Sequence, residues 1–351
     1  MPIEAETPSR TPRAIVLGCA GERLSADERR FFAAVDPLGF VLFRRNCKTP
    51  DQVRALVAEF RDAVGRADAP VLIDQEGGRV ARLQPPHWQA YPAPARIAAL
   101  PDPLAAEAAV LGARLIADDL ALLGITVDAI PVLDLPASGA DPVIGDRAYG
   151  SEPQRVARLG RAVCEGLLAG GVLPIIKHIP GHGRALVDSH RALPRVTADR
   201  PLLASSDFAP FRALSAMPWA MTAHIVFEAI DAAAPATFSQ PVIDDIIRGD
   251  IGFDGVLISD DISMGALAGG LGERTRRALD AGCDLALHCT GVLAEMEEVA
   301  GASPSLSPQA QTRIARGETL RLASQQGFDR RAAEARFAQL LAQTATVATS
   351  R

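Results

Sequence analysis

Eight short apolar segments recur along the chain, and segments with helical periodicity separate most of them. The apolar segments are AIVLG (14–18), GFVLF (39–43), PVLID (70–74), VDAIPVLDL (127–135), LPIIKH (173–178), WAMTAH (219–224), GVLISDD (255–261) and CDLALH (283–288). DQVRALVAEFRDAVGRA, after Thr49-Pro50, is one of the helical segments. Continuous apolar strands are typical of parallel sheets covered by helices. We therefore predict an α/β fold, a single-domain (β/α)8 TIM-type barrel, with a doubly wound sheet as the alternative.

Ionisable side chains stand at the ends of most of these apolar segments. They are Asp74, Asp134, Lys177 with His178, His224, Asp260 and His288. A barrel gathers the carboxyl ends of its strands around one mouth, whereas an open sheet spreads them along a line. The repetition therefore favours the barrel, and we expect these side chains to form one polar pocket.

The remaining segments give no sign of a second domain. Residues 1–13 form a polar N-terminal extension, and the Pro-, Ala- and Gly-rich segments 84–104 and 134–145 are interpreted as loops. The segment of about 304–351 is interpreted as a C-terminal helical tail, with surface turns followed by a final helix, RRAAEARFAQLLAQTA. We therefore expect residues 1–351 to form a single catalytic domain.

Charge and composition narrow the classes of partner. The chain has 36 Lys+Arg against 42 Asp+Glu, a net charge of −6, and no basic block, which argues against nucleic acid or an anionic membrane. Its N-terminus contains no signal-peptide core and no segment that could cross a bilayer. Five cysteines without a CxxC indicate reduced thiols that pack in the core. We expect a cytoplasmic protein that acts on a small molecule. The sequence leaves its oligomeric state open, with a monomer favoured.

The segment KHIPGHGRALVDSH, residues 177–190, carries the densest set of polar side chains. Gly181 and Gly183 allow unusual backbone angles in this loop. Asp188 lies two positions before His190 and can hydrogen bond to one ring nitrogen, which leaves the other nitrogen to transfer protons. The pattern therefore indicates an acid/base pair in preference to a solvated loop histidine.

Zinc binding is an alternative for the same segment, since its three histidines and Asp188 offer nitrogen and oxygen ligands. Lys177 places a positive charge beside His178, which disfavours a cation, and neither HExxH nor HxH spacing occurs. We therefore predict no metal and no cofactor.

The segment GVLISDDISM, residues 255–264, brings two adjacent carboxylates to the predicted barrel mouth. Neighbouring side chains of an extended segment point to opposite sides, so Asp260 and Asp261 are not expected to share one function. A helix N-cap explains Asp261 but leaves Asp260 unexplained. One of the two acids is therefore expected to face a substrate.

Two further segments contribute charged side chains to the loops of the predicted barrel mouth. DQEGGRVAR, residues 74–82, contains Asp74, Arg79 and Arg82, and GDRAYG contains Arg147. Carboxylates and guanidinium groups at a pocket rim make charge-assisted hydrogen bonds to sugar hydroxyls or to anions. A surface salt bridge is the alternative for Arg79.

Four of these segments, taken in order, resemble the single-domain bacterial β-N-acetylglucosaminidases of glycoside hydrolase family 3. They are DQEGGRVAR, GDRAYG, KHIPGHGRALVDSH and GVLISDDISM. The resemblance spans about residues 14–290 and departs at Ile179, where the family often has Phe. It implies a cytoplasmic β-N-acetylhexosaminidase that removes terminal GlcNAc from 1,6-anhydroMurNAc-containing muropeptides during peptidoglycan recycling.

The resemblance also implies the roles of individual residues. Asp260 becomes the nucleophile that forms a covalent glycosyl-enzyme, and Asp188 with His190 becomes the acid/base dyad of a retaining reaction. Most glycosidases use two carboxylates, so a histidine in the second position departs from the usual pattern. The side chains implied to hold the sugar hydroxyls are Asp74, Arg82, Arg147, Lys177 and His178.

Three alternative functions stay open at this stage. Paired acids such as Asp260 and Asp261 also occur in hexosaminidases whose substrate supplies its own acetamido nucleophile. Phosphate could replace water as the acceptor, because a histidine repels an anion less than a carboxylate does. The third alternative is a non-catalytic barrel that binds muropeptides, against which the intact Asp188, His190 and Asp260 argue.

Overall fold

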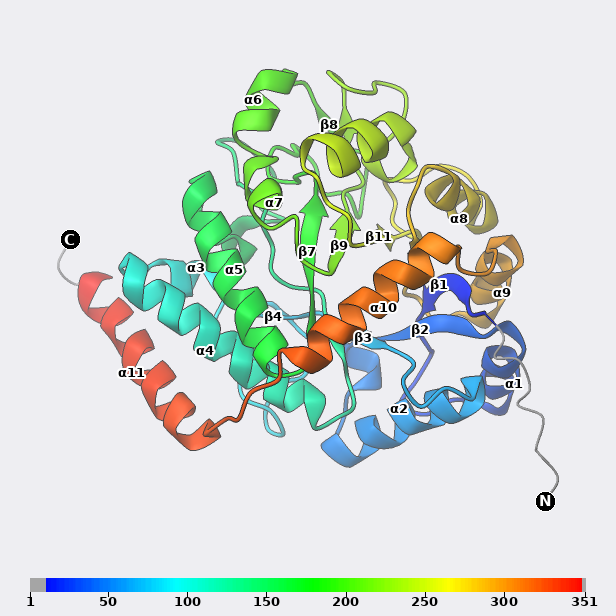
Figure 1. Ribbon diagram of the computed structural model, residues 1–351, viewed down its shortest axis with the longest axis horizontal. Helices are drawn as coiled ribbons and strands as arrows, with labels where there is room; N and C mark the ends of the chain where they lie inside the picture. Colours follow the sequence, from blue (N-terminus) through cyan, green and yellow to red (C-terminus); the bar gives the residue numbers. More distant parts are fainter. Residues whose placement is uncertain (1–10, 349–351) are drawn as a thin grey trace.

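The structure is a computed structural model, and it describes residues 11–348 (Figure 1). Eight parallel strands close into a barrel in the order β1-β12-β11-β9-β7-β6-β3-β2. The strands are β1 (Arg13–Leu17), β2 (Pro37–Leu42), β3 (Val71–Ile73), β6 (Val127–Asp128), β7 (Leu173–Ile179), β9 (Trp219–Thr222), β11 (Val256–Asp261) and β12 (Leu285–His288). Each falls within or overlaps one of the eight apolar segments, so the predicted barrel is confirmed and the open sheet is excluded.

Helices surround the barrel (Figure 1). They are α1 (Ala26–Val35), α2 (Pro50–Val64), α3 (Pro94–Ala98), α4 (Asp102–Ala121), α5 (Pro153–Ala169), α6 (Arg200–Ser205), α7 (Ala209–Ala213), α8 (Leu271–Asp280), α9 (Leu293–Ala302), α10 (Pro308–Ala323) and α11 (Arg330–Ala348). Helix α2 begins where Thr49 accepts a hydrogen bond from the backbone N–H of Gln52 and Pro50 occupies the first turn. No helix in residues 11–348 is long and apolar enough to cross a membrane.

Side chains of each strand alternate between two hydrophobic clusters. In β1, Val16 belongs to the cluster inside the barrel, whereas Ile15 and Leu17 pack with the cluster beneath the helices. All three are fully buried. This two-sided burial explains why the strands are continuously apolar in sequence. The ionisable residues at the strand ends therefore interrupt this apolar pattern.

The C-terminal segment differs from the sequence prediction. Helix α10 occupies part of the region interpreted as surface turns, and it crosses the amino-terminal end of the barrel, where Ala310 is buried with the interior residues (Figure 1). The turn interpretation was wrong because Ser307 and Pro308 are also a helix start signal, and the Ser307 hydroxyl accepts from the Ala310 N–H. The predicted final helix is α11, which packs on α4.

Two other predictions concern the N-terminus and a loop. The predicted N-terminal extension, residues 1–13, lies mostly outside the described residues, and Arg13 is the first residue of β1. The predicted loop 84–104 contains the short helix α3 and the start of α4. Pro94 and Pro103 lie in the first turns of these helices, so two of the prolines that indicated a loop instead begin helices.

Candidate active site

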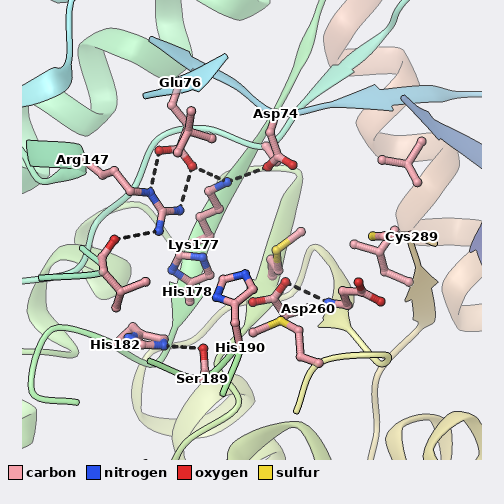
Figure 2. A pocket seen from close by; sticks show the side chains of 18 of the residues that line it. Asp74, Glu76, Arg147, Lys177, His178, His182, Ser189, His190, Asp260 and Cys289 are labelled. Atoms are coloured by element: carbon pink, nitrogen blue, oxygen red, sulfur yellow. Dashed lines mark hydrogen bonds and ion pairs between the residues drawn. The ribbon is translucent and has the colours of Figure 1, made fainter. Parts of the chain in front are cut away.

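A cavity of about 320 Å³ opens at the carboxyl ends of the barrel strands. Its wall contains every side chain to which the family resemblance gave a catalytic or sugar-binding role: Asp74, Arg82, Arg147, Lys177, His178, Asp188, His190 and Asp260. Figure 2 labels all of these except Arg82 and Asp188. These residues come from segments far apart in the chain, and the closure of the barrel brings them together.

Asp74 lies directly after β3 between two cations. Its Oδ1 accepts from Lys177 Nζ and its Oδ2 from Arg82 Nη2, each at 2.9 Å. Burial alone would raise the pKa of Asp74, but the charges of Lys177 and Arg82 outweigh it and hold the pKa below its ordinary value. Asp74 therefore remains a carboxylate and can accept hydrogen bonds from sugar hydroxyls.

Glu76 joins the same cluster, and the sequence analysis gave it no role. Its carboxylate accepts two hydrogen bonds from Arg147, both at 2.8 Å, and lies 2.7 Å from Lys177 Nζ (Figure 2). Burial would raise the pKa of Glu76, but Lys177 and Arg147 lower it overall. The available signal was its position two residues after Asp74, on the same side of an extended segment. Glu76 fixes both cations in the cavity wall.

His178 is oriented by a buried carboxylate. Asp134 Oδ2 lies 2.6 Å from His178 Nδ1, and its Oδ1 accepts the backbone N–H groups of His178 and His182 at 3.2 and 2.7 Å. Because Nδ1 is occupied, Nε2 is the ring nitrogen that is available to a ligand in the cavity.

The expectation of one polar pocket at all the strand ends is only partly correct. Among the described residues, Asp134, His224 and His288 do not contribute to the cavity wall, and all three are buried. The ring of His224 instead bonds to Thr237 Oγ1 at 2.7 Å and to the Asp261 carbonyl at 3.0 Å. Strand-end position alone does not distinguish a side chain that faces the cavity from one that supports it.

Asp260 and Asp261 both line the cavity, which the predicted alternation did not anticipate, and they differ in their hydrogen-bond partners. Asp260 Oδ1 accepts the backbone N–H of Asp261 at 2.8 Å. Burial would raise the pKa of Asp260, but the neighbouring His178 contributes to holding it below its ordinary value. The Asp261 carboxylate accepts the backbone N–H and the hydroxyl of Ser263 at 2.9 and 2.7 Å. Asp261 caps this turn and no helix, because α8 begins only at Leu271.

Asp188 and His190 form the predicted pair. Asp188 Oδ1 lies 2.7 Å from His190 Nδ1 and also accepts the His190 backbone N–H at 2.9 Å. Burial would raise the pKa of Asp188, but these bonds to His190 lower it. The side chain of His190 is 63% exposed and lines the cavity together with Asp260 (Figure 2). The loop therefore folds back over the barrel mouth and leaves Nε2 of His190 unoccupied by Asp188.

The remaining candidates from the sequence are Arg79, the cysteines and a metal site. Arg79 binds Asp146 at 2.9 Å at the cavity rim, so the surface salt bridge proposed as its alternative is present. All five cysteines are free thiols, and Cys289 lines the cavity although a packing role was expected for it. Within residues 11–348, no three His, Cys, Asp or Glu side chains are grouped to hold a metal ion.

Comparison with known proteins identifies the family. Residues 17–317 match the model of the glycosyl hydrolase family 3 N-terminal domain. A β-hexosaminidase of Alkalilimnicola ehrlichii is 40% identical over 282 residues, which cover 78% of this chain and 80% of that protein. NagZ from Neisseria gonorrhoeae, solved in complex with N-trifluoroacetyl-D-glucosamine, superposes with a TM-score of 0.84 at 33% identity, covering 95% of this chain and 100% of that one.

A more distant solved structure has the same fold. The β-N-acetylhexosaminidase of Beutenbergia cavernae has a TM-score of 0.73 at 28% identity, and the match covers 89% of this chain and 96% of that chain. The barrel, its cavity and these relatives agree, and the chain therefore belongs to glycosyl hydrolase family 3 and is a glycoside hydrolase.

Proposed function

We propose that this enzyme is a retaining β-N-acetylhexosaminidase that removes non-reducing terminal GlcNAc from 1,6-anhydroMurNAc-containing muropeptides, in the cytoplasm, during peptidoglycan recycling. The observation that carries the proposal is that Asp260 and the Asp188–His190 pair line one cavity beside a cluster of charged sugar-binding groups. The β-hexosaminidase relatives, and the glucosamine derivative in the Neisseria gonorrhoeae structure, support the sugar specificity.

In the first step, an Asp260 carboxylate oxygen attacks the anomeric carbon while the bond to the leaving oxygen breaks. His190, protonated on Nε2, gives that proton to the leaving oxygen. The products are a covalent glycosyl-enzyme on Asp260 and the released aglycone. The Asp261 backbone N–H donates a hydrogen bond to Asp260 Oδ1, and this bond orients the carboxylate for the attack.

In the second step, neutral His190 takes a proton from water through Nε2, and the water oxygen attacks the anomeric carbon. The bond to Asp260 breaks, and two inversions give net retention. Asp188 holds Nδ1 throughout, so it fixes the tautomer in which Nε2 exchanges the proton. A histidine and its supporting carboxylate thus take the place of the second carboxylic acid of most glycosidases.

The charged cluster fits a neutral sugar rich in hydroxyls. Its cations have carboxylate partners, so a hydroxyl that enters the cavity meets both donors and acceptors. The residues proposed to bind the sugar are Asp74, Arg82, Arg147, Lys177 and His178. Closely paired charges keep their positions before the substrate arrives, which lowers the cost of ordering the site.

The test is hydrolysis of 4-nitrophenyl β-N-acetylglucosaminide by the wild type and two variants. Asp260→Ala should abolish activity, and His190→Ala should reduce it by about 10²–10⁴-fold, the usual contribution of acid/base catalysis. Asp27→Ala, which removes an exposed carboxylate of α1, is the matched control and should match the wild type. A 2-deoxy-2-fluoro or 5-fluoro glycosyl donor should label Asp260. Turnover without any adduct would refute the nucleophile assignment.

A phosphorylase is the second candidate, because the acid/base group His190 is a histidine, and a histidine repels an anion less than a carboxylate does. Phosphate would then attack the glycosyl-enzyme in place of water and give a sugar phosphate. Rates with and without phosphate, together with product analysis, distinguish the two reactions. Unchanged rates and free GlcNAc as the product support the hydrolase.

A further inference from the structure

The loop of residues 180–192, which carries the acid/base pair and is called the acid/base loop below, has a firmly held first half. The backbone N–H of Ala137 donates to the Gly183 carbonyl at 2.9 Å, and the N–H of Asp141 donates to the Ala185 carbonyl at 2.8 Å. This half is therefore attached to the preceding strand-to-helix loop of the barrel.

The tip of the acid/base loop then leaves the protein surface. Leu186 is 68% exposed and Val187 is 40% exposed. The chain becomes buried again at Ser189, which is 2% exposed, directly before His190. The position of His190 therefore depends on what holds Ser189.

Both the side chain and the backbone of Ser189 are held. Its Oγ lies 3.0 Å from Nε2 of His182 (Figure 2). Its carbonyl accepts the backbone N–H of Ala266 at 3.1 Å. His182 is itself 3% exposed, and its N–H donates to Asp134 at 2.7 Å. Burial lowers the pKa of His182 to about 4, so its ring stays neutral and its bond to Ser189 does not titrate near neutral pH. Ser189 thus binds the first half of its own loop at His182, which Asp134 holds from the preceding loop, and binds the loop after β11 at Ala266.

A glycine allows the acid/base loop to lie close to the loop that follows β11. An added Cβ on Gly265 would lie 2.8 Å from the His190 carbonyl oxygen and 3.3 Å from that of Arg191. The backbone of the acid/base pair therefore rests directly on the loop that follows β11, the strand that ends at Asp260 and Asp261. The nucleophile and the acid/base histidine are connected through this contact.

We propose that Ser189 is a positioning residue that holds His190 over the cavity. It does so through its bonds to His182 and Ala266, together with the close approach of Gly265. The proposal rests on the proposed acid/base role of His190. Proton transfer needs the donor within hydrogen-bond reach of the leaving oxygen, and a displacement of about 1 Å can reduce a rate by about 10². His182 was the one histidine of the 177–190 segment without a role, and here it supports the loop.

The experiment compares leaving groups. Aryl β-N-acetylglucosaminides with a poor leaving group, such as phenol, need protonation by His190, whereas 2,4-dinitrophenolate leaves without it. Ser189→Ala should reduce kcat/KM for the phenyl glycoside by about 10-fold or more and for the 2,4-dinitrophenyl glycoside by less than about 3-fold. Gly265→Ala should give the same pattern without removing a hydrogen bond, because its Cβ displaces the His190 backbone.

Two controls separate positioning from general damage. Leu186→Ala changes an exposed side chain of the same loop, and Gly301→Ala adds a Cβ with nothing within 4 Å, so both should match the wild type. In a His190→Ala background, Ser189→Ala should cause no further loss, since Ser189 acts through His190. Equal losses for both leaving groups, or losses that add to those of His190→Ala, would overturn the proposal.

The same data distinguish this proposal from the proposed function. If His190→Ala depends strongly on the leaving group and Ser189→Ala does not, the acid/base assignment survives and the positioning role is refuted. If His190→Ala shows no such dependence, both are refuted. Thermal unfolding of each variant, with a midpoint close to that of the wild type, shows that the change in rate arises in the folded enzyme.

Discussion

Replacement of Glu76 by glutamine tests how strongly the buried ion pairs support both the fold and the site. Glu76 has a side chain that is 1% exposed, and it pairs with Arg147 and Lys177, which are 10% and 2% exposed. Glutamine has nearly the same shape but no charge. Its amide oxygen can accept one hydrogen bond, while its NH2 group is directed at a cation. The change therefore leaves buried positive charge without its partner.

The size of the effect follows from the burial of these groups. Removing one partner of a buried pair costs about 3–5 kcal/mol, because the remaining charge stays desolvated. For a chain of 351 residues with an unfolding entropy of about 2.1 cal/mol/K per residue, this cost lowers the thermal midpoint by about 4–7 °C. Arg147 and Lys177 also lose their fixed positions in the cavity, so kcat/KM should fall by about 10².

Thermal unfolding and hydrolysis of 4-nitrophenyl β-N-acetylglucosaminide measure the two effects of Glu76→Gln. Glu318→Gln is the matched control: Glu318 pairs with Arg321 on α10 and is 39% exposed, so its loss should cost less than about 1 kcal/mol. If Glu76→Gln had the same midpoint and the same kcat/KM as this control, the reasoning from buried ion pairs would be refuted.

Three further predictions use other parts of the structure. Burial raises the pKa of Asp128 to about 8, so this carboxyl makes the wild type less stable as pH rises from about 4 to 8. Over that range the thermal midpoint of Asp128→Asn should rise relative to that of the wild type, and a constant difference between the two midpoints would contradict this. Phe337→Ala removes a ring that is 1% exposed and should cost about 3–5 kcal/mol in denaturant unfolding, whereas an unchanged midpoint would show that α11 adds little stability. Gly183→Ala places a Cβ 1.9 Å from the Leu135 carbonyl oxygen, so activity should fall by about 10², and full activity would be inconsistent with the position of the loop.

The eight strands could be predicted because each is apolar on both faces. Strands inside a helix-covered barrel bury both sides, and this requirement is visible in residues such as Ile15, Val16 and Leu17 without any knowledge of the fold. Helix α10 was missed because its start signal, Ser307 with Pro308, is also a turn signal. Local chemistry permits both, and packing across the barrel end selects the helix.

The contacts of the candidate site could also be predicted only in part. The acid/base pair lies within three residues, so the bond between Asp188 and His190 could be predicted from spacing. Glu76 and Arg147 are 71 positions apart, and no local pattern connects them. The sequence likewise contained no signal that Asp134 supports His178 from outside the cavity, since both stand at strand ends.

The sequence by itself determined the order of the eight barrel strands, several of the charged groups at the barrel mouth and the pairing of Asp188 with His190. Only the tertiary structure decided which charges face each other, which of them are desolvated and where the acid/base loop rests. The physical reason is that local patterns depend on neighbours in the chain, whereas ion pairs and burial depend on distances in space. Closure of the barrel brings Lys177 to Asp74, 103 positions away, and the conformation of the acid/base loop places Ser189 against His182. Neither contact follows from composition or periodicity.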